Sequence, residues 1–152
     1  MNAPPQLRLR LSDNHRRSIS VSLHLLDKEL CQWEQWLEGH LAPGPMYQQQ
    51  NNLSGKEKTD LRDRITALRE VMARLCADLG LAPNKPGTAQ LIVGQATILW
   101  EMLAELNSSS LRGYGEVPPE LARYLDPLGQ SLTQQMHAIT ALFSGPTANR
   151  KV

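Results

Sequence analysis

Large apolar residues, most of them leucine, recur every three or four positions along four separate stretches of this chain. Such spacing places the apolar side chains along one side of an α-helix, so each stretch is predicted to be an amphipathic helix. The composition agrees, because 25 leucines stand against 5 isoleucines, 5 valines and a single phenylalanine. Leucine favours helices, whereas β-branched and aromatic residues favour strands. We therefore expect an all-α fold.

Capping and breaking residues set the limits of the predicted helices. Ser54 and Glu57 have the spacing of a capping box, and Gly80 is a typical helix stop. The third helix is the most apolar of the four, so we expect it to be the most deeply buried. The four predicted helices cover residues 18–40, 54–79, 88–106 and 118–144.

Four amphipathic helices bury their apolar stripes when they lie side by side. The sequence predicts an antiparallel up-down-up-down four-helix bundle over residues 18–144, in which Ile65, Leu99 and Leu132 are buried. We expect an extended or disordered N-terminal arm over residues 1–17 and a frayed C-terminal tail over residues 145–152.

Two local features leave alternatives open. Apolar residues alternate with polar ones within residues 7–25, which is also compatible with a β-hairpin, although an isolated two-stranded hairpin is marginal in water. We favour an arm followed by a helix. In the last helix, Asp126 precedes Pro127, whose ring lacks an N–H. The helix is expected to kink there or to restart with Asp126 as its cap.

Length and charge exclude several classes of protein. The chain has 152 residues and a net charge of +1, which suits one soluble domain. No apolar run reaches the roughly 18 residues that a membrane helix requires, and residues 1–6 do not resemble a signal peptide. Near-neutral charge argues against nucleic-acid binding. We expect a cytoplasmic protein with no membrane or nucleic-acid partner.

No catalytic or metal-binding motif is present. In the predicted antiparallel bundle, His24, His137 and Cys76 lie at similar heights near one end, but their spacing in the sequence matches no zinc motif. Glu101 and Glu105 lie one helical turn apart, which is more typical of a solvated strip than of an acid–base pair. We therefore predict no enzyme activity, no cofactor and no metal. Cys31 and Cys76 are expected to be free thiols.

The candidate partner-binding residues lie mainly in the two long connections, which a four-helix bundle would bring to one end. Each connection carries one tyrosine that is expected to be exposed, Tyr47 in the first and Tyr114 in the second. The second connection is rich in glycine, which allows a tight loop. Tyrosine, tryptophan and arginine are enriched at binding hot spots. Alternatively, Tyr114 covers the end of the bundle and Arg112 pairs with Glu116. The candidate set is Arg112, Tyr114, Glu116, Tyr47 and Trp36.

These observations favour a non-enzymatic helical protein that mediates protein–protein interaction, as a small adaptor or regulatory subunit. Its partner would be another protein or a second copy of the chain, because the leucine-rich seams offer spare apolar surface. The alternative is a helical bundle that binds a small ligand or a metal between its helices.

Overall fold

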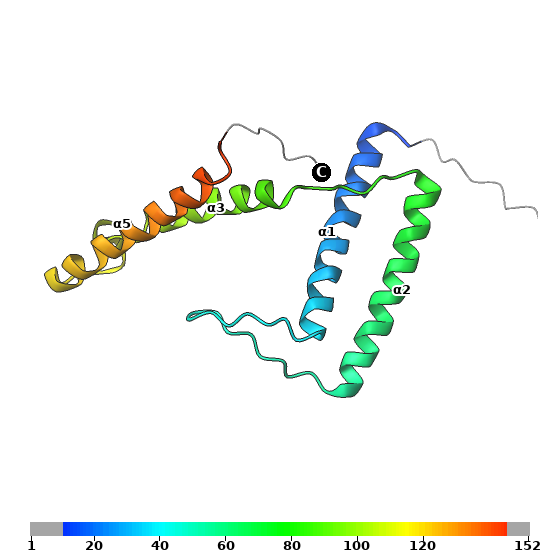
Figure 1. The fold of residues 1–152 in the computed structure, drawn as a ribbon, viewed down its shortest axis with the longest axis horizontal. Coiled ribbons are helices and arrows are strands. Elements are labelled where there is room, and N and C mark those ends of the chain that lie inside the picture. Colours follow the sequence, from blue (N-terminus) through cyan, green and yellow to red (C-terminus); the bar gives the residue numbers. More distant parts are fainter. Residues whose placement is uncertain (1–10, 146–152) are drawn as a thin grey trace, which may run out of the picture. The chain divides into compact units, whose positions relative to one another are not determined.

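The computed structural model describes residues 11–145, and this part of the chain is helical (Figure 1). It contains no β-strand, so the prediction of an all-α fold is confirmed over these residues. The elements are α1 (Asp13–Leu37), α2 (Gly55–Leu79), α3 (Thr88–Ala104), α4 (Ser108–Leu111), the short 3-10 helix η1 (Arg112–Tyr114) and α5 (Pro119–Ala141).

The chain divides into two compact units between Asn84 and Lys85. In the first unit α1 packs against α2, and in the second α3 packs against α5. The single up-down-up-down bundle over residues 18–144 therefore stays a prediction.

Helix α1 begins five residues earlier than predicted, so Asp13–Arg17 do not belong to an extended arm. The Ser12 hydroxyl accepts a hydrogen bond from the His15 N–H at 3.2 Å, which caps the helix. Arg16 then donates to the carbonyl oxygen of Leu79 at 2.6 Å, at the end of α2. This contact between distant parts of the chain supports the extra turn.

The structure also tests the β-hairpin alternative and parts of the two terminal segments. A hairpin within residues 7–25 is wrong for its second half, because residues 19–25 are helical. Residues 11–12 of the predicted arm precede the helix, whereas residues 1–10 of the arm and residues 146–152 of the predicted tail lie outside the described residues.

Helix α2 has the limits that the sequence predicts. Ser54 and Glu57 form a complete capping box, with the Ser54 N–H donating to Glu57 Oε2 at 2.7 Å and the Glu57 N–H donating to Ser54 Oγ at 3.2 Å. Gly80 ends the helix with a φ of 61°, a left-handed conformation that favours glycine.

The core of the first unit is a seam between α1 and α2. Leu30 is fully buried and Ile65 is 2% exposed, so the prediction that Ile65 is buried is confirmed. Leu37 completes the buried cluster. Partly buried apolar residues of both helices pack around it, namely Leu26, Trp33, Leu61 and Met72.

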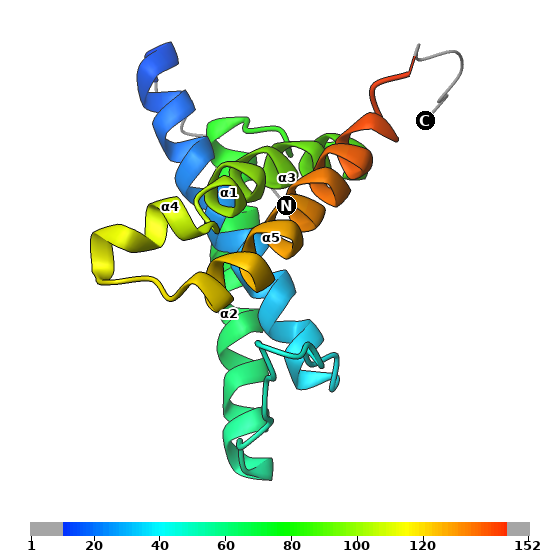
Figure 2. The same cartoon turned by 90° about the vertical axis from the view of Figure 1, so that its left-hand side faces the viewer.

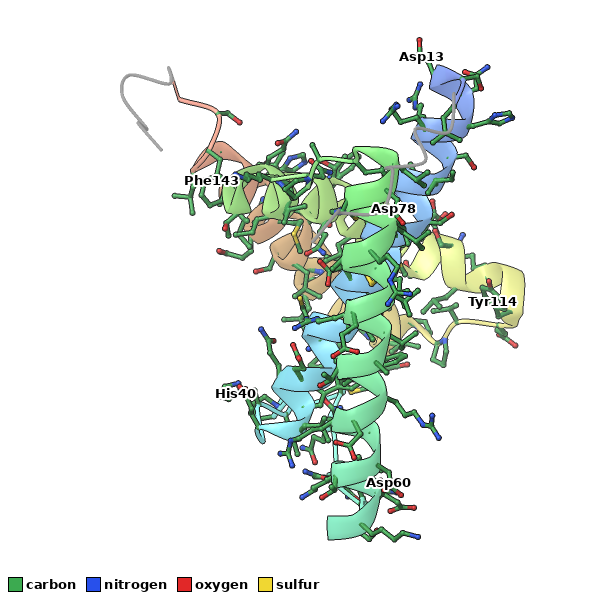
Figure 3. The ribbon with its side chains drawn as sticks, turned by 90° about the vertical axis from the view of Figure 1, so that its right-hand side faces the viewer. Asp13, His40, Asp60, Asp78, Tyr114 and Phe143 are labelled. Carbon is green, nitrogen blue, oxygen red and sulfur yellow. The ribbon has the colours of Figure 1, made fainter. Side chains whose placement is uncertain are left out.

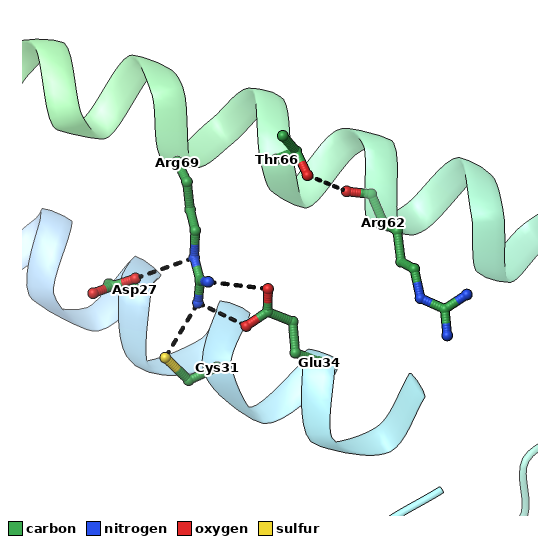
Figure 4. Close-up of polar contacts among 6 residues, drawn as sticks. All are labelled: Asp27, Cys31, Glu34, Arg62, Thr66 and Arg69. Atoms are coloured by element: carbon green, nitrogen blue, oxygen red, sulfur yellow. Dashed lines mark hydrogen bonds and ion pairs between the residues drawn. The ribbon is translucent and has the colours of Figure 1, made fainter. Parts of the chain in front are cut away.

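Beside this seam, Arg69 of α2 links several side chains of α1 (Figure 4). Its guanidinium makes a bidentate contact with Glu34, at 3.0 Å for Nη1–Oε1 and 2.8 Å for Nη2–Oε2. Asp27 Oδ1 lies 3.7 Å from Nε, and Cys31 Sγ lies 3.3 Å from Nη2. Because the fork geometry of arginine matches a carboxylate, this contact also helps to fix the helix register.

We predict that Arg69→Lys destabilises the first unit by about 0.5–1 kcal/mol, because lysine cannot make the bidentate contact. Urea unfolding followed by circular dichroism measures this change. The effect should shrink in about 1 M salt, where the screening length is roughly 3 Å. Arg74→Lys, on the exposed surface of α2, is the matched control and should unfold like the wild type. Equal stability of Arg69→Lys and wild type at low salt would contradict the prediction.

In the second unit α3 and α5 run antiparallel. Trp100 of α3 stacks obliquely on His137 of α5 with ring centroids 4.9 Å apart, whereas Leu106, beyond the end of α3, meets Gly129. The later residue of the first segment therefore contacts the earlier residue of α5, which is the pattern of antiparallel helices. Helix α5 runs without interruption through Pro127, so the alternative of a restart capped by Asp126 is wrong.

The seam between α3 and α5 differs from the predicted one. Leu99 and Leu132, both expected to be buried, are each 46% exposed, and Ala96 is the one fully buried residue of α3. The expectation that the third helix is the most deeply buried is therefore wrong for the described structure. The residues of α3 that are buried or half-buried are instead Ala89, Val93, Ala96, Trp100 and Leu103.

Gly129 is a position of close backbone approach in this unit. A Cβ atom on Gly129 would overlap the carbonyl oxygen of Leu106, which is backbone and has little freedom to move. The glycine is buried within α5. Its lack of a side chain therefore determines how closely the segment after α3 can approach α5.

We predict that Gly129→Ala destabilises the second unit by about 1–3 kcal/mol, because the added methyl group overpacks this contact. Gly94→Ala is a matched control inside α3, where an added Cβ meets nothing within 4 Å. It should stabilise the protein by about 0.5–1 kcal/mol, since alanine is the better helix former. Thermal unfolding of both variants provides the comparison. A more stable Gly129→Ala protein would show that this close approach is not a constraint.

Candidate interaction surface

Each helix of the second unit carries more apolar surface than its neighbour covers. Besides the seam, α3 and α5 display a second row of large apolar side chains, which we call the outer stripe. The outer stripe comprises Leu91, Ile92, Ile98, Leu99 and Met102 of α3, and Leu121, Tyr124, Leu128, Leu132, Ile139 and Leu142 at or near α5, all of them exposed.

The helical repeat places both halves of the outer stripe on one face of the pair. At 3.6 residues per turn, the outer-stripe residues of each helix are displaced from the seam of that helix by rotation in the same direction about the helix axis. When two helices are antiparallel, residues displaced from the contact in the same direction of rotation lie on the same face of the pair. The two halves of the outer stripe therefore lie on one face of the α3–α5 pair, where the exposed Gln95 and Gln135 interrupt them.

A short segment between these two helices forms a loop with a defined conformation. The Asn107 side chain caps α4 by accepting from the Ser110 N–H at 2.9 Å. Asp126 of α5 accepts two further bonds from Ser108, one from its N–H and one from its hydroxyl, both at 2.7 Å. Ser108 is buried. These bonds attach the start of the loop to α5.

The hydrogen bonds from Ser108 also affect the acidity of Asp126. The backbone N–H and then the hydroxyl of Ser108 favour the ionised carboxylate and hold the pKa of Asp126 below its usual value, and Arg112 adds a smaller electrostatic contribution. A lowered pKa in the folded state means that ionised Asp126 stabilises the fold. This stabilisation is present above the pKa of the unfolded chain and is lost as the pH falls through the folded value.

We predict that Asp126→Asn reduces the loss of thermal stability that accompanies acidification from about pH 5 to pH 3, because this carboxylate no longer has to be protonated. The unfolding midpoint measured across this pH range, for wild type and variant, gives the comparison. Glu120→Gln, which alters an exposed acid of the same helix, is the control and should leave most of the dependence in place. Identical curves for wild type and Asp126→Asn would exclude this role.

The loop presents Tyr114 to solvent. Figure 3 shows this side chain at the outer end of the segment, and Figure 2 shows the segment extending from α3 and α5. Tyr114 is 92% exposed, so the alternative in which it covers the end of the helices is wrong for this unit. Gly115 follows with a φ of 143° and turns the chain toward α5.

Arg112 and Glu116 flank Tyr114 and are also exposed. No ion pair joins them within residues 11–145, contrary to the alternative considered from the sequence. The structure therefore brings together three of the candidate residues, two of them charged, on one loop. Helix α5 and its half of the outer stripe begin a few residues further on.

The remaining two candidates, Trp36 and Tyr47, belong to the first unit. Both line one hollow of about 620 Å³, together with His40 and residues of the loop after α1. Trp36 is half-buried and Tyr47 is exposed. The structure thus brings these two residues together within the first unit.

The carboxylates considered for acid–base chemistry lie on the surface of the second unit. Glu101 and Glu105 are both exposed, and Ser110 donates to Glu105 at 2.9 Å. Within residues 11–145, no group of three or more histidine, cysteine, aspartate or glutamate side chains is arranged to hold a metal ion. Cys31 and Cys76 are free.

Sequence reasoning missed the outer stripe as a separate surface. It predicted that Leu99 of α3 and Leu132 of α5 are buried, whereas both belong to the exposed outer stripe. The signal was present, because the apolar residues of α3 and α5 are too many for one narrow seam. In a helix with a wide apolar arc, several different sets of residues have the three- and four-residue spacing of a seam, so the spacing alone does not identify which set is buried.

Comparison with family models, curated proteins and solved structures finds no match for this chain. Among the helices described, none combines the length and apolar character needed to cross a membrane.

Proposed function

We propose that this chain is a non-enzymatic protein that binds another protein through its second unit, as a small adaptor or regulatory subunit. The observation that carries this proposal is the outer stripe of α3 and α5, a set of large apolar side chains that the helix pair leaves exposed. Large exposed apolar surfaces on a protein are typical of interaction sites.

The shape of this surface favours a helical partner. Apolar side chains along two antiparallel helices can pack against the apolar face of a third helix, which inserts side chains at three- and four-residue spacing. The partner would be another protein with an amphipathic helix or a second copy of this chain. A single apolar helix face from either source would cover the outer stripe.

The loop adds polar contacts beside the apolar surface. Tyr114 combines a large ring with a hydroxyl group, and Arg112 and Glu116 supply charges of both signs. Residues of these types are common in the polar rim and the hot spots of interfaces. In this proposal Tyr114 is the anchoring side chain, and the charged neighbours determine the orientation of the partner.

The proposal retains the other expectations from the sequence. Trp36 and Tyr47 form a second contact area on the first unit. The protein acts in the cytoplasm, without nucleic acid, membrane, metal or enzymatic chemistry. Support for these points comes from the near-neutral charge and from the lack of a catalytic motif in the sequence.

Affinity capture from cells of the source organism tests the proposal. We expect the wild-type chain to retain a partner that Tyr114→Ala and Leu132→Gln each retain about tenfold less well, because a hot-spot side chain contributes at least about 1.4 kcal/mol. Sedimentation of the purified chain distinguishes the two kinds of partner, since a second copy gives a dimer that the same substitutions dissociate.

Matched controls separate this surface from general exposure. Met46→Ala removes an equally exposed side chain from the loop of the first unit, and Leu68→Gln alters an exposed leucine of α2. Both should behave like the wild type. If Tyr114→Ala and Leu132→Gln leave the captured proteins and the sedimentation unchanged, the proposed surface is wrong.

A further inference from the structure

A cavity of about 370 Å³ lies within the first unit, where the end of α1, the following loop and the start of α2 meet. Trp33 and Trp36 form one wall, and Leu61 of α2 forms part of another. The loop contributes Leu41, Leu53 and the consecutive amide residues 49–52. Cavities that bind small molecules have volumes of roughly 300–1,000 Å³, so this one has room for a ligand of one or two rings.

Backbone hydrogen bonds give the loop wall a defined position. The Gln49 N–H donates to the Ala42 carbonyl at 3.0 Å, and the Gly44 N–H donates to the Tyr47 carbonyl at 3.0 Å. Gly39, with a φ of 89°, turns the chain directly after α1. The loop therefore folds back on itself before it passes the two tryptophans. These bonds hold the part of the loop that leads into the cavity-lining residues 49–52.

The lining of the cavity contains no charged residue. An anionic or cationic ligand would lose hydration there without gaining a charged partner, which is unfavourable. The apolar walls favour a hydrophobic body. The amides of Gln49, Gln50 and Asn52 offer both N–H donors and carbonyl acceptors to a polar edge. Charge complementarity thus favours a neutral ligand with one polar side.

The tryptophan wall further restricts the ligand. Trp33 and Trp36 are three positions apart on α1, so their side chains are neighbours on one side of the helix. Indole rings interact best with other flat rings through stacked or edge-to-face contacts. A planar aromatic molecule uses this wall more fully than an aliphatic chain does.

We propose that this cavity binds a neutral, planar aromatic small molecule with one hydrogen-bonding edge, of the indole or phenol class. The ring lies against Trp33 and Trp36, and its N–H or O–H donates to an amide carbonyl within residues 49–52. The site belongs entirely to the first unit. It shares Trp36 with the second contact area proposed there, and it is independent of the outer stripe and the Tyr114 loop of the second unit.

Fluorine NMR with three matched probes tests the charge preference of the cavity. The probes are 5-fluoroindole, its anionic 3-carboxylate derivative and the cationic 5-fluorotryptamine. We expect 5-fluoroindole to bind the full-length protein saturably at one site. The two charged probes should bind at least about tenfold more weakly, because burial of an unpaired charge is costly. Equal affinity for the three probes, or no saturable binding of 5-fluoroindole, would overturn the proposal.

Substitutions then locate the site. Trp36→Ala should weaken 5-fluoroindole binding at least about tenfold, whereas Trp36→Phe, which keeps an aromatic ring, should retain most of it. Leu53→Trp adds bulk to the cavity from an exposed loop position and should also block binding, which covers the case in which Trp36→Ala does not fold. Tyr114→Ala, in the second unit, is the control with wild-type affinity. Undiminished binding to folded Trp36→Ala and Leu53→Trp would place the probe elsewhere and refute the proposal.

Discussion

A pair of helices can cover only one seam on each of its members, and this constraint governs the second unit. Helices α3 and α5 each have an apolar arc that is wider than the contact between them. At Gly129 the segment after α3 comes so close to α5 that a Cβ atom would overlap the Leu106 carbonyl, so this contact requires a residue without a side chain. The outer stripe is the part of each arc that remains exposed, and the proposed function depends on it.

Polar contacts complement this apolar arrangement at specific positions. In the first unit, the Arg69 guanidinium joins Glu34 across the helix pair, and Arg16 binds carbonyl groups at the end of α2. In the second unit, Asp126 holds the start of the loop through two bonds from Ser108. Since none of these side chains lies in an apolar seam, they set register and loop position, while apolar contacts hold the helices together. Tyr114 is presented to solvent by a loop that is attached in this way.

Prediction from sequence succeeded where the deciding interactions are local. The capping box of Ser54 and Glu57 and the stop at Gly80 involve neighbours in the chain, and both are present. The start of α1 was predicted late: the Ser12 cap is a local signal that was overlooked, and Arg16 also contacts a residue more than sixty positions away. The burial of Leu99 and Leu132 was predicted wrongly because a wide apolar arc is compatible with more than one seam. In the candidate site, residue type indicated Tyr114, whereas its exposure depended on how the loop folds.

The sequence by itself determined that this chain is helical, because leucine spacing, caps and breakers act over a few residues and suffice to define each helix. It also determined the residue types available for binding, including the uncharged loop beside Trp36. Only the tertiary structure decided which apolar side chains meet and which remain exposed, since that choice depends on close approaches such as Gly129 against Leu106. It likewise decided that the loop after α1 folds back to form a cavity with the two tryptophans, because this requires contacts between segments that no local pattern encodes.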